Sequence, residues 1–260
     1  MKKNNCKINI IIPLLPLLVL VTLTPVRLSA RCLSDGLELR ARVGYSIGGT
    51  APLSMPATIR SIEAFHLTPN FLAGVDASST PGSNWGWQVG LFIENKGMDG
   101  EVKTKAYRMK VRMDESEMEG YYTGRVRQKV TEWMFTLPVQ ATYLLSEQVK
   151  LKAGPYVSLL FNKDFSGYAS DGYLRKDDPT GPKVVMGSKE GEWATYDFSD
   201  DMRPLQAGIA AGLEWQMQQR LGFSFDLSWG LTGIHKSDFK TVEQTLYPIY
   251  GTIALTYRLK

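Results

Sequence analysis

The chain has 260 residues, of which 43% are hydrophobic, 22% charged and 11% aromatic, so it is long enough for one large β domain and is not disordered in composition. Its formal net charge of +4 equals the four basic residues among the first 30, where no Asp or Glu occurs; the remaining 26 basic and 26 acidic side chains cancel. This balance argues against a general electrostatic grip on nucleic acid, and we predict no nucleic-acid partner. Two cysteines exclude a disulfide scaffold and a thiolate zinc cluster.

Residues 1–30 have the order of a secretory signal peptide. A cationic start precedes roughly 14 almost wholly apolar residues, 10–23, and small residues end the segment at Ala30. A membrane-spanning helix needs roughly 20 apolar residues, and Pro13 and Pro16 interrupt this run. We therefore predict a signal peptide over residues 1–30, cleaved after Ala30.

Residues 31–260 are predicted to form the exported domain. No window of about 18 apolar residues follows the leader, which excludes a helical membrane protein and leaves a soluble exported domain or a membrane barrel. Cys32 leaves a lipid anchor open as an alternative, although Arg31 precedes it where such sites take a small residue.

The exported part is dominated by apolar and polar residues that alternate with a period of two. Such alternation gives a strand one apolar and one polar face. In the first segment Leu39, Ala41 and Val43 alternate with Arg40 and Arg42. In chain order the predicted strands are residues 37–47, 71–77 (the weakest pattern), 85–94, 132–143, 149–159, 205–215, 221–231 and 249–260.

Two further features favour a membrane barrel, with its apolar face outward, over a soluble β-sandwich or lipocalin-like barrel. The connections alternate between long and short, at roughly 20, 7, 35, 3, 40, 4 and 10 residues. Tryptophan and tyrosine lie on the apolar face near strand ends, where a membrane interface would suit them. We therefore predict an all-β protein: a closed antiparallel eight-stranded transmembrane β-barrel with short periplasmic turns and long extracellular loops, located in the outer membrane.

The polar faces of these strands carry charges in mid-strand. In lipid an open sheet edge is too costly, so the first and last strands must pair. Eight strands leave an interior that side chains just fill, so we expect no wide pore. The lumen is predicted to hold a polar network of both charge signs, formed by Arg40, Arg42, Asp76, Lys150, Lys152, Glu214 and Asp226.

Short motifs in a fixed order resemble the PorT-like outer-membrane β-barrel family over most of residues 37–260. The resemblance implies an eight-stranded barrel exported to the outer membrane of Gram-negative cells and no catalytic residues. Some members are tied to protein secretion or gliding, a role that does not transfer on fold alone. The motifs are residues 90–97 (GLFIENKG), 137–139 (LPV), 152–157 (KAGPYV), 165–168 (FSGY), 171–175 (DGYLR), 196–201 (YDFSDD), 230–231 (GL) and 247–250 (YPIY).

Catalytic and cofactor motifs are missing from the sequence. The two histidines, His66 and His235, lie in predicted connections, outside any HExxH-type motif, and no GxSxG, Walker or dinucleotide fingerprint is present. We predict no enzyme activity, no cofactor and no metal. The acidic cluster Asp197, Asp200 and Asp201, with Glu190 and Glu192, raises the hypothesis of calcium binding, but a solvated loop is the preferred interpretation.

Residues 101–127 are predicted to form a β-hairpin that extends beyond the membrane, with basic arms and an acidic tip. The arms are expected to contact anionic lipid headgroups or lipopolysaccharide phosphates through Lys103, Lys105, Arg108 and Arg125. The alternative is an ordinary charged hairpin, solvated on both faces.

The function predicted from these features is that of a non-enzymatic outer-membrane barrel, structural or binding through its long loops. Its expected partners are outer-membrane lipid, lipopolysaccharide, and an unknown protein or surface ligand at those loops. The alternatives are a small passive channel, an outer-membrane enzyme that uses the two histidines, and a soluble exported β-sandwich or lipocalin-like binding protein.

Overall fold

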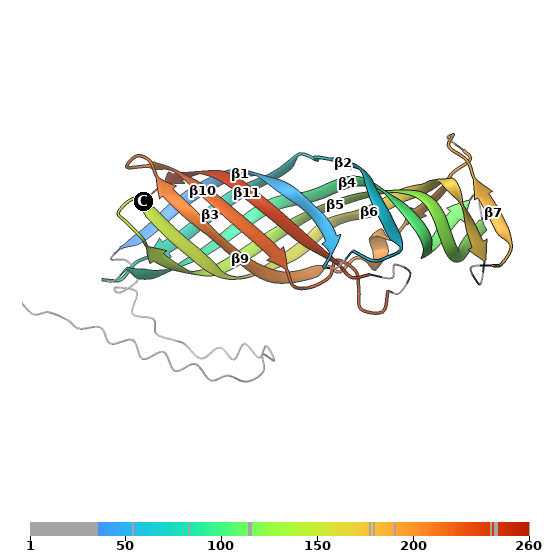
Figure 1. The fold of residues 1–260 in the computed structure, drawn as a ribbon. Coiled ribbons are helices and arrows are strands. Elements are labelled where there is room, and N and C mark those ends of the chain that lie inside the picture. Colours follow the sequence, from blue (N-terminus) through green and yellow to red (C-terminus); the bar gives the residue numbers. More distant parts are fainter. Residues whose placement is uncertain are drawn as a thin grey trace, which may run out of the picture.

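The computed structural model describes residues 36–53, 55–82, 84–113, 116–176, 178, 180–189, 191–239, 241 and 244–259. The predicted signal peptide, Cys32 and Glu190 lie outside these residues. The described part contains no helix long and apolar enough to cross a membrane. Its elements, shown in Figure 1, are β1 (Leu37–Pro52), β2 (Ile59–His66), β3 (Asn70–Ser79), β4 (Trp85–Met113), β5 (Ser116–Leu144), β6 (Val149–Lys176), β7 (Lys183–Met186), β8 (Ala194–Asp197), the 3-10 helix η1 (Ser199–Asp201), β9 (Leu205–Gln216), β10 (Leu221–Gly230) and β11 (Leu246–Arg258).

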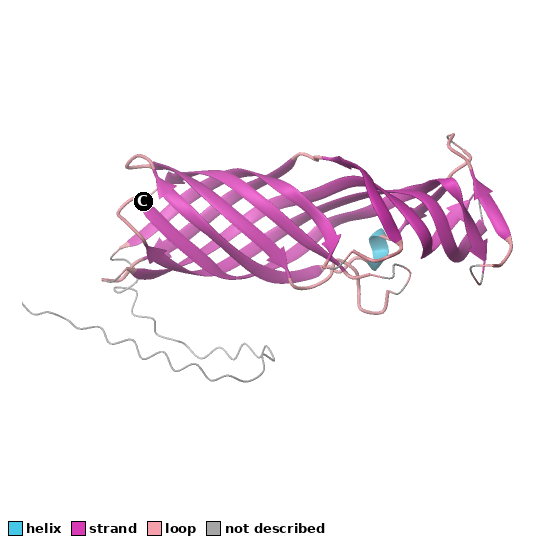
Figure 2. Cartoon of the chain, in the orientation of Figure 1, coloured by secondary structure: helices cyan, strands magenta, loops and turns pink. Residues whose placement is uncertain are grey.

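Eight of the strands form a closed antiparallel ring. Its order is β3-β1-β11-β10-β9-β6-β5-β4, and β4 pairs back onto β3. The first and last strands close it, from Arg40 opposite Arg258 to Pro52 opposite Leu246. The predicted eight-stranded barrel is therefore confirmed. Each predicted strand, including residues 71–77 in β3, corresponds to one strand of the barrel wall (Figure 2).

The apolar faces of the ring point outward. Val43 and Leu227 are 63% and 59% exposed, whereas Arg42, between the apolar residues of β1, is 4% exposed and lies inside. An exposed apolar band around a polar interior is the arrangement of a membrane barrel. The alternative of a sandwich or lipocalin-like barrel, with apolar faces inward, is wrong because it requires the opposite orientation of the same strands.

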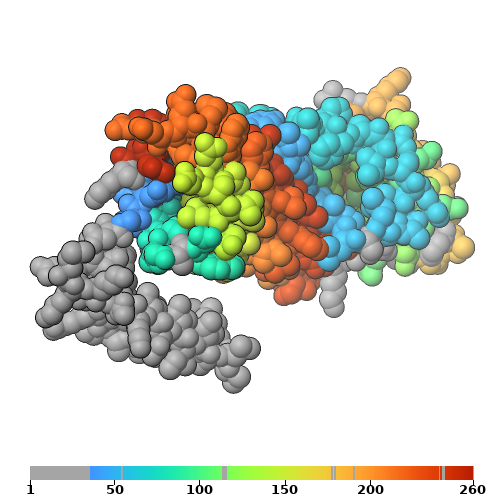
Figure 3. All heavy atoms as spheres, turned by 60° about the vertical axis from the view of Figure 1, so that its left-hand side comes forward, coloured from blue at the N-terminus to red at the C-terminus, as the bar shows by residue number. Residues whose placement is uncertain are grey.

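Tight turns gather at one end of the barrel. The turns around residues 80–84, 145–148 and 217–220 lie there, together with the start of β1 and the end of β11. Figure 3 brings this end forward, with the blue start of β1 near the red end of β11. The longer connections lie at the opposite end, as predicted for the extracellular side.

The extracellular side contains far more β structure than the predicted loops implied. Strands β4 and β5 have 29 residues each and β6 has 28, about three times the 9–11 residues that cross a membrane. At about 3.3 Å per residue, each of these strands runs roughly 90 Å. β4 and β5 stay paired out to Met113 opposite Ser116, so residues 101–127 belong to a β-hairpin, as predicted. Much of the remaining predicted loop sequence lies in β2, β7 and β8.

Beyond the membrane band the polarity of the sheet reverses. Along β5, the inward side chains are first polar, at Gln140 and Thr136, and then apolar, at Val130 and Val126. β8 pairs with both β6 and β4 and so closes β4, β5 and β6 into a second, narrower ring. We call this part the extension; its apolar core includes Met109, Val111, Tyr122, Val126, Val130, Phe165, Ala169, Leu174, Met186, Ala194, Tyr196 and Phe198.

Candidate functional site

The structure brings the seven sequence-predicted lumen residues together on the inner face of the barrel. Arg42 of β1 is their centre: its guanidinium lies 2.9 Å from Asp76, 3.2 Å from Asp226 and 3.6 Å from Glu214. Lys152 lies 2.9 Å from the other carboxylate oxygen of Asp226. Every one of these contacts joins different strands, so the network braces the barrel wall from inside.

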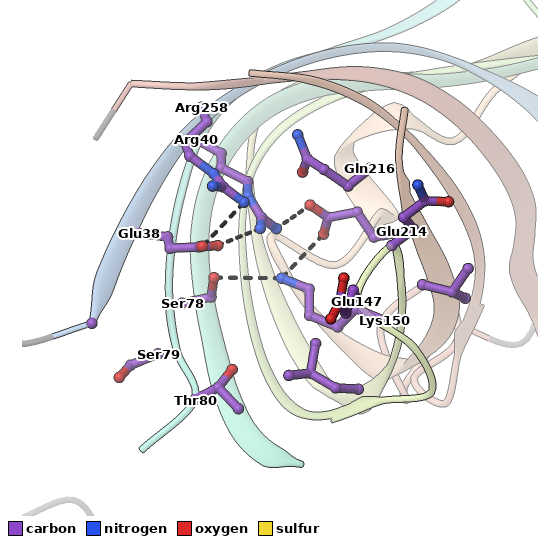
Figure 4. Close-up of a pocket in the computed structure, with 14 residues that line it drawn as sticks. Glu38, Arg40, Ser78, Ser79, Thr80, Glu147, Lys150, Glu214, Gln216 and Arg258 are labelled. Atoms are coloured by element: carbon purple, nitrogen blue, oxygen red, sulfur yellow. Dashed lines mark hydrogen bonds and ion pairs between the residues drawn. The ribbon is translucent and has the colours of Figure 1, made fainter. Parts of the chain in front are cut away.

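The network continues to the short-turn mouth of the barrel. Glu214 accepts a hydrogen bond from Arg40 and lies 3.4 Å from the Lys150 ammonium. Arg40 also pairs with Glu38, which lies 3.1 Å from Arg258. Figure 4 shows these side chains converging on a cavity of about 330 Å³ that the mouth encloses.

A second polar layer lies deeper, toward the extension. The Lys96 ammonium is 3.2 Å from Glu94 and sits over the rings of Tyr156 and Tyr250, at 5.2 and 5.6 Å from their centroids. Glu132 accepts a hydrogen bond of 2.6 Å from Gln206. The sequence analysis included Glu94 and Glu132 in the predicted strands 85–94 and 132–143 but did not assign them to the lumen network, and Lys96 lies beyond the predicted end of its strand.

The two layers pack the lumen with charged and aromatic side chains. Among the described residues, the two polar layers hold six basic and six acidic side chains, so their charges balance. The mouth cavity and the next cavity inward, of about 60 Å³, share no lining residue. The twelve charged residues are Arg40, Arg42, Lys96, Lys150, Lys152, Arg258, Glu38, Asp76, Glu94, Glu132, Glu214 and Asp226.

The four basic residues predicted to contact anionic groups all lie exposed on the outer face of the extension. Lys103 and Arg125 are directly opposite each other in the β4–β5 ladder. Arg125 has Asp171 and Glu101 at 3.6 and 3.8 Å, and Arg108 pairs with Glu119 at 2.8 Å. Arg125 is eight residues beyond Trp133, an outward aromatic at the end of the apolar band on β5, which places Arg125 roughly 25 Å further along the strand.

The two histidines occupy different surroundings. His66 is exposed at the end of β2. His235 is buried between the rings of Phe165 and Phe239, each 4.6 Å away between ring centroids, and this burial lowers the pKa of His235 to about 4. Among the described residues no hydrogen bond joins either imidazole to a hydroxyl or a carboxylate, which a general base acting on a nucleophile would need.

Acidification is expected to destabilise the packing around His235. The pKa of His235 is lower in the folded protein than in the unfolded chain, so protonation of the imidazole favours unfolding. The contribution of the neutral imidazole to the free energy of unfolding is therefore complete above about pH 6.5 and is lost as the pH falls toward 4. The variant His235→Phe keeps a ring between Phe165 and Phe239 but cannot titrate. Thermal unfolding at pH 7.5 and 4.5 should therefore show a smaller pH dependence for this variant, and an equal dependence would contradict the assignment.

The predicted acidic cluster does not form a metal site in the part of the chain that the structure describes, where no three His, Cys, Asp or Glu side chains converge. Asp197 instead accepts hydrogen bonds from the backbone N–H and hydroxyl of Ser199, at 2.9 and 2.6 Å, at the start of η1. The carboxylate therefore shapes the turn between β8 and η1.

An eight-stranded ring with an apolar outside, a charged inside and tight turns at one end defines an outer-membrane β-barrel. Residues 29–236 match the sequence model of the outer membrane protein beta-barrel domain, and the chain belongs to this family. No curated protein matches the sequence.

Two solved structures illustrate the likeness. The attachment invasion locus protein Ail of Yersinia pestis is 8% identical, with 86% of this chain and 99% of that chain covered and a TM-score of 0.39. Neisserial surface protein A is 9% identical, with 86% and 97% covered and a TM-score of 0.32. At these values the comparison with the two proteins supports no functional argument.

Proposed function

We propose that this protein is a non-enzymatic surface-binding protein of the outer membrane. The barrel is a closed anchor, and the extension is the part that presents a binding surface. The observation that carries this proposal is the continuation of β4, β5 and β6 into a second closed ring with its own apolar core. A protein that needed only to span the membrane would gain nothing from strands of 28 and 29 residues.

The alternative of a passive channel is disfavoured by the packed lumen. We expect the purified protein to produce no conductance steps in planar lipid bilayers, because the ion pairs and rings of the two polar layers fill the cross-section of the lumen. As a matched test, the conductance of the double variant Arg42→Ala with Asp76→Ala is measured in the same bilayers. This variant lacks one ion pair of the lumen, but the net charge of the lumen is unchanged. Steady conductance by the wild-type protein would overturn the closed-anchor part of the proposal.

The narrower proposal concerns the ligand. We infer that Lys103, Lys105, Arg108 and Arg125 bind an anionic group such as the phosphates of lipopolysaccharide. Lys103 and Arg125 lie directly opposite each other on neighbouring strands, where like charges repel. A bound anion would reduce this repulsion. Their distance along the strand beyond Trp133 favours phosphates of the saccharide over the headgroups at the membrane surface.

This ligand is tested by charge neutralisation. Replacing the four residues by glutamine is expected to weaken binding of purified lipopolysaccharide about tenfold at low salt, since each exposed cation contributes on the order of 1 kcal/mol or less. The control replaces Lys176 and Lys189, which are also exposed on the extension. Unchanged affinity of the fourfold variant, or an equal loss in the control, would remove the anion site and leave the surface-binding role to another ligand.

Two finer points remain proposals. We propose that export uses the predicted signal peptide over residues 1–30, so that the mature protein begins at Arg31; mass spectrometry of protein from outer-membrane fractions measures this directly. We also propose the PorT-like assignment, supported by the motifs named above, three of which fall in β6. A gene deletion with normal protein secretion and gliding would separate this chain from the family members tied to those processes.

A further inference from the structure

The barrel wall is open on one side just above the membrane band. The β1–β3 ladder runs from Leu37 opposite Ser79 to Ser46 opposite Asn70 and ends there. In the part of the chain that the structure describes, β1 beyond Ser46 pairs with β11 alone, and β2, which continues the line of β3, pairs with β4 alone. Figure 1 shows β1 and β2 diverging at this level, so the two strand edges enclose a gap.

This gap holds a cavity of about 420 Å³, which we call the lateral cleft. None of the described residues that line it is charged, and most are apolar. Gln128 comes from β5, which borders neither edge of the gap, so the cleft reaches through the wall into the interior. Its apolar lining includes Pro52, Met55, Ile59, Ile62, Phe65, Met98, Val102 and Leu246.

The open wall exposes side chains of the inward face of the sheet. Ile62 and Phe65 lie opposite Val102 and Gly100, and residues directly opposite in an antiparallel pair share one face. Val102 packs against the core of the extension, yet Ile62 is 61% and Phe65 48% exposed. Apolar surface that belongs to an interior but is left open to water marks a binding site.

One lip of the cleft is continuous with the lipid-facing band. Ile249 lines the cleft and also belongs to the outward face of β11, where it lies opposite Trp229 of β10. The cleft therefore opens next to the outer edge of the hydrocarbon region, and its described lining is uncharged and mostly apolar. Its volume is at the low end of small-ligand pockets, which run from about 300 to 1,000 Å³.

We propose that the lateral cleft binds the aliphatic chain of a single-chain amphiphile, of which a long-chain fatty acid is the simplest example. The uncharged lining fits the chain, and the polar head remains at the opening. A bilayer lipid fits less well because it carries at least two chains, whereas the cleft offers one cavity of about 420 Å³. This inference stands independently of the anion site on the extension.

The experiment uses palmitic acid with a diazirine in its chain, added to the full-length protein in phospholipid nanodiscs. After illumination, adducts are expected on peptides that contain Phe65 and Met98. Their labelling yield should be well above that of peptides from the lipid-facing band. A second arm places the same diazirine in a phospholipid chain. Labelling of the cleft by the phospholipid as strongly as by the free acid would overturn the single-chain proposal and assign the cleft to bilayer lipid.

Two variants and a control sharpen the test. A Cβ at Gly100 would lie 3.6 Å from the Ala64 oxygen and 4.0 Å from the Phe65 ring, so Gly100→Leu fits locally and fills the cleft. We expect it to reduce labelling of the cleft about tenfold or more. Gly251→Leu, whose Cβ would meet only the Ile47 oxygen at 3.8 Å, lies outside the cleft and should leave labelling unchanged.

The second variant is Ile62→Glu, which places a charge at an exposed position of the lining and needs no repacking of the core. It should also reduce cleft labelling, and heat-modifiable gel mobility verifies that each variant is folded. Folded Gly100→Leu and Ile62→Glu proteins that are labelled like the wild type would overturn the proposal.

Discussion

Replacing Glu214 by glutamine is expected to lower the free energy of unfolding by about 3–5 kcal/mol, the cost of removing one partner from a buried ion-pair network. The Glu214 side chain is 2% exposed and faces three cations at once: Arg40, Arg42 and Lys150. Glutamine keeps the shape of the side chain but leaves these cations with one carboxylate fewer in a closed lumen. Urea unfolding of the protein in lipid vesicles, followed by tryptophan fluorescence, measures the loss.

The same mouth supplies a matched control for Glu214. Glu147 lines the same cavity but is exposed on the turn between β5 and β6, so Glu147→Gln should change the unfolding free energy by less than about 0.5 kcal/mol. Adding Arg40→Gln to Glu214→Gln removes one of the stranded cations and should recover part of the stability. Equal midpoints for wild type and Glu214→Gln would show that the network does not brace the barrel.

The membrane part of the fold could be predicted because lipid imposes one rule on every strand. Side chains alternate between faces, so Val43 and Leu227 had to point toward lipid once Arg42 and Asp226 were assigned to the lumen. Even the short pattern around Asp76 was enough to identify β3. Closure followed from the cost of an unpaired edge in lipid, without any information on contacts.

The extension could not be predicted by that rule because its polarity is reversed. On β5 the predicted strand of residues 132–143 stops three residues short of Lys129, the first charged outward position. In the structure the strand continues, and Val130 and Val126 face inward while Lys129 and Arg125 face water. The alternation still has a period of two, but the apolar residues now occupy the inward-facing positions instead of the outward-facing ones. This change marks the point where the strand leaves the membrane, and in the sequence it resembles the start of a loop.

The lateral cleft was beyond sequence reasoning for a different reason. Nothing in residues 47–66 shows that β1 and β2 fail to pair, because pairing depends on where β2 joins β4 across the register shifts near Ser61 and Ala64. Local patterns determine which face a residue occupies, whereas the gap arises from how distant strands are registered.

The second large effect is the free-energy cost of placing a charged side chain on the apolar outer face of the barrel. This cost is expected to depend on how deep the position lies in the membrane and not on how exposed the side chain is. Leu227 is 59% and Leu231 56% exposed, so a soluble protein would tolerate arginine equally at both. In a membrane barrel, Leu227→Arg near the middle of the band should destabilise by about 2–4 kcal/mol, and Leu231→Arg at its edge by about 0–1 kcal/mol. The same vesicle unfolding assay compares the two variants, which differ only by four positions along the line of β10. Equal costs would mean that the exposed apolar band does not face lipid, and with that the anchor role of the barrel would be lost.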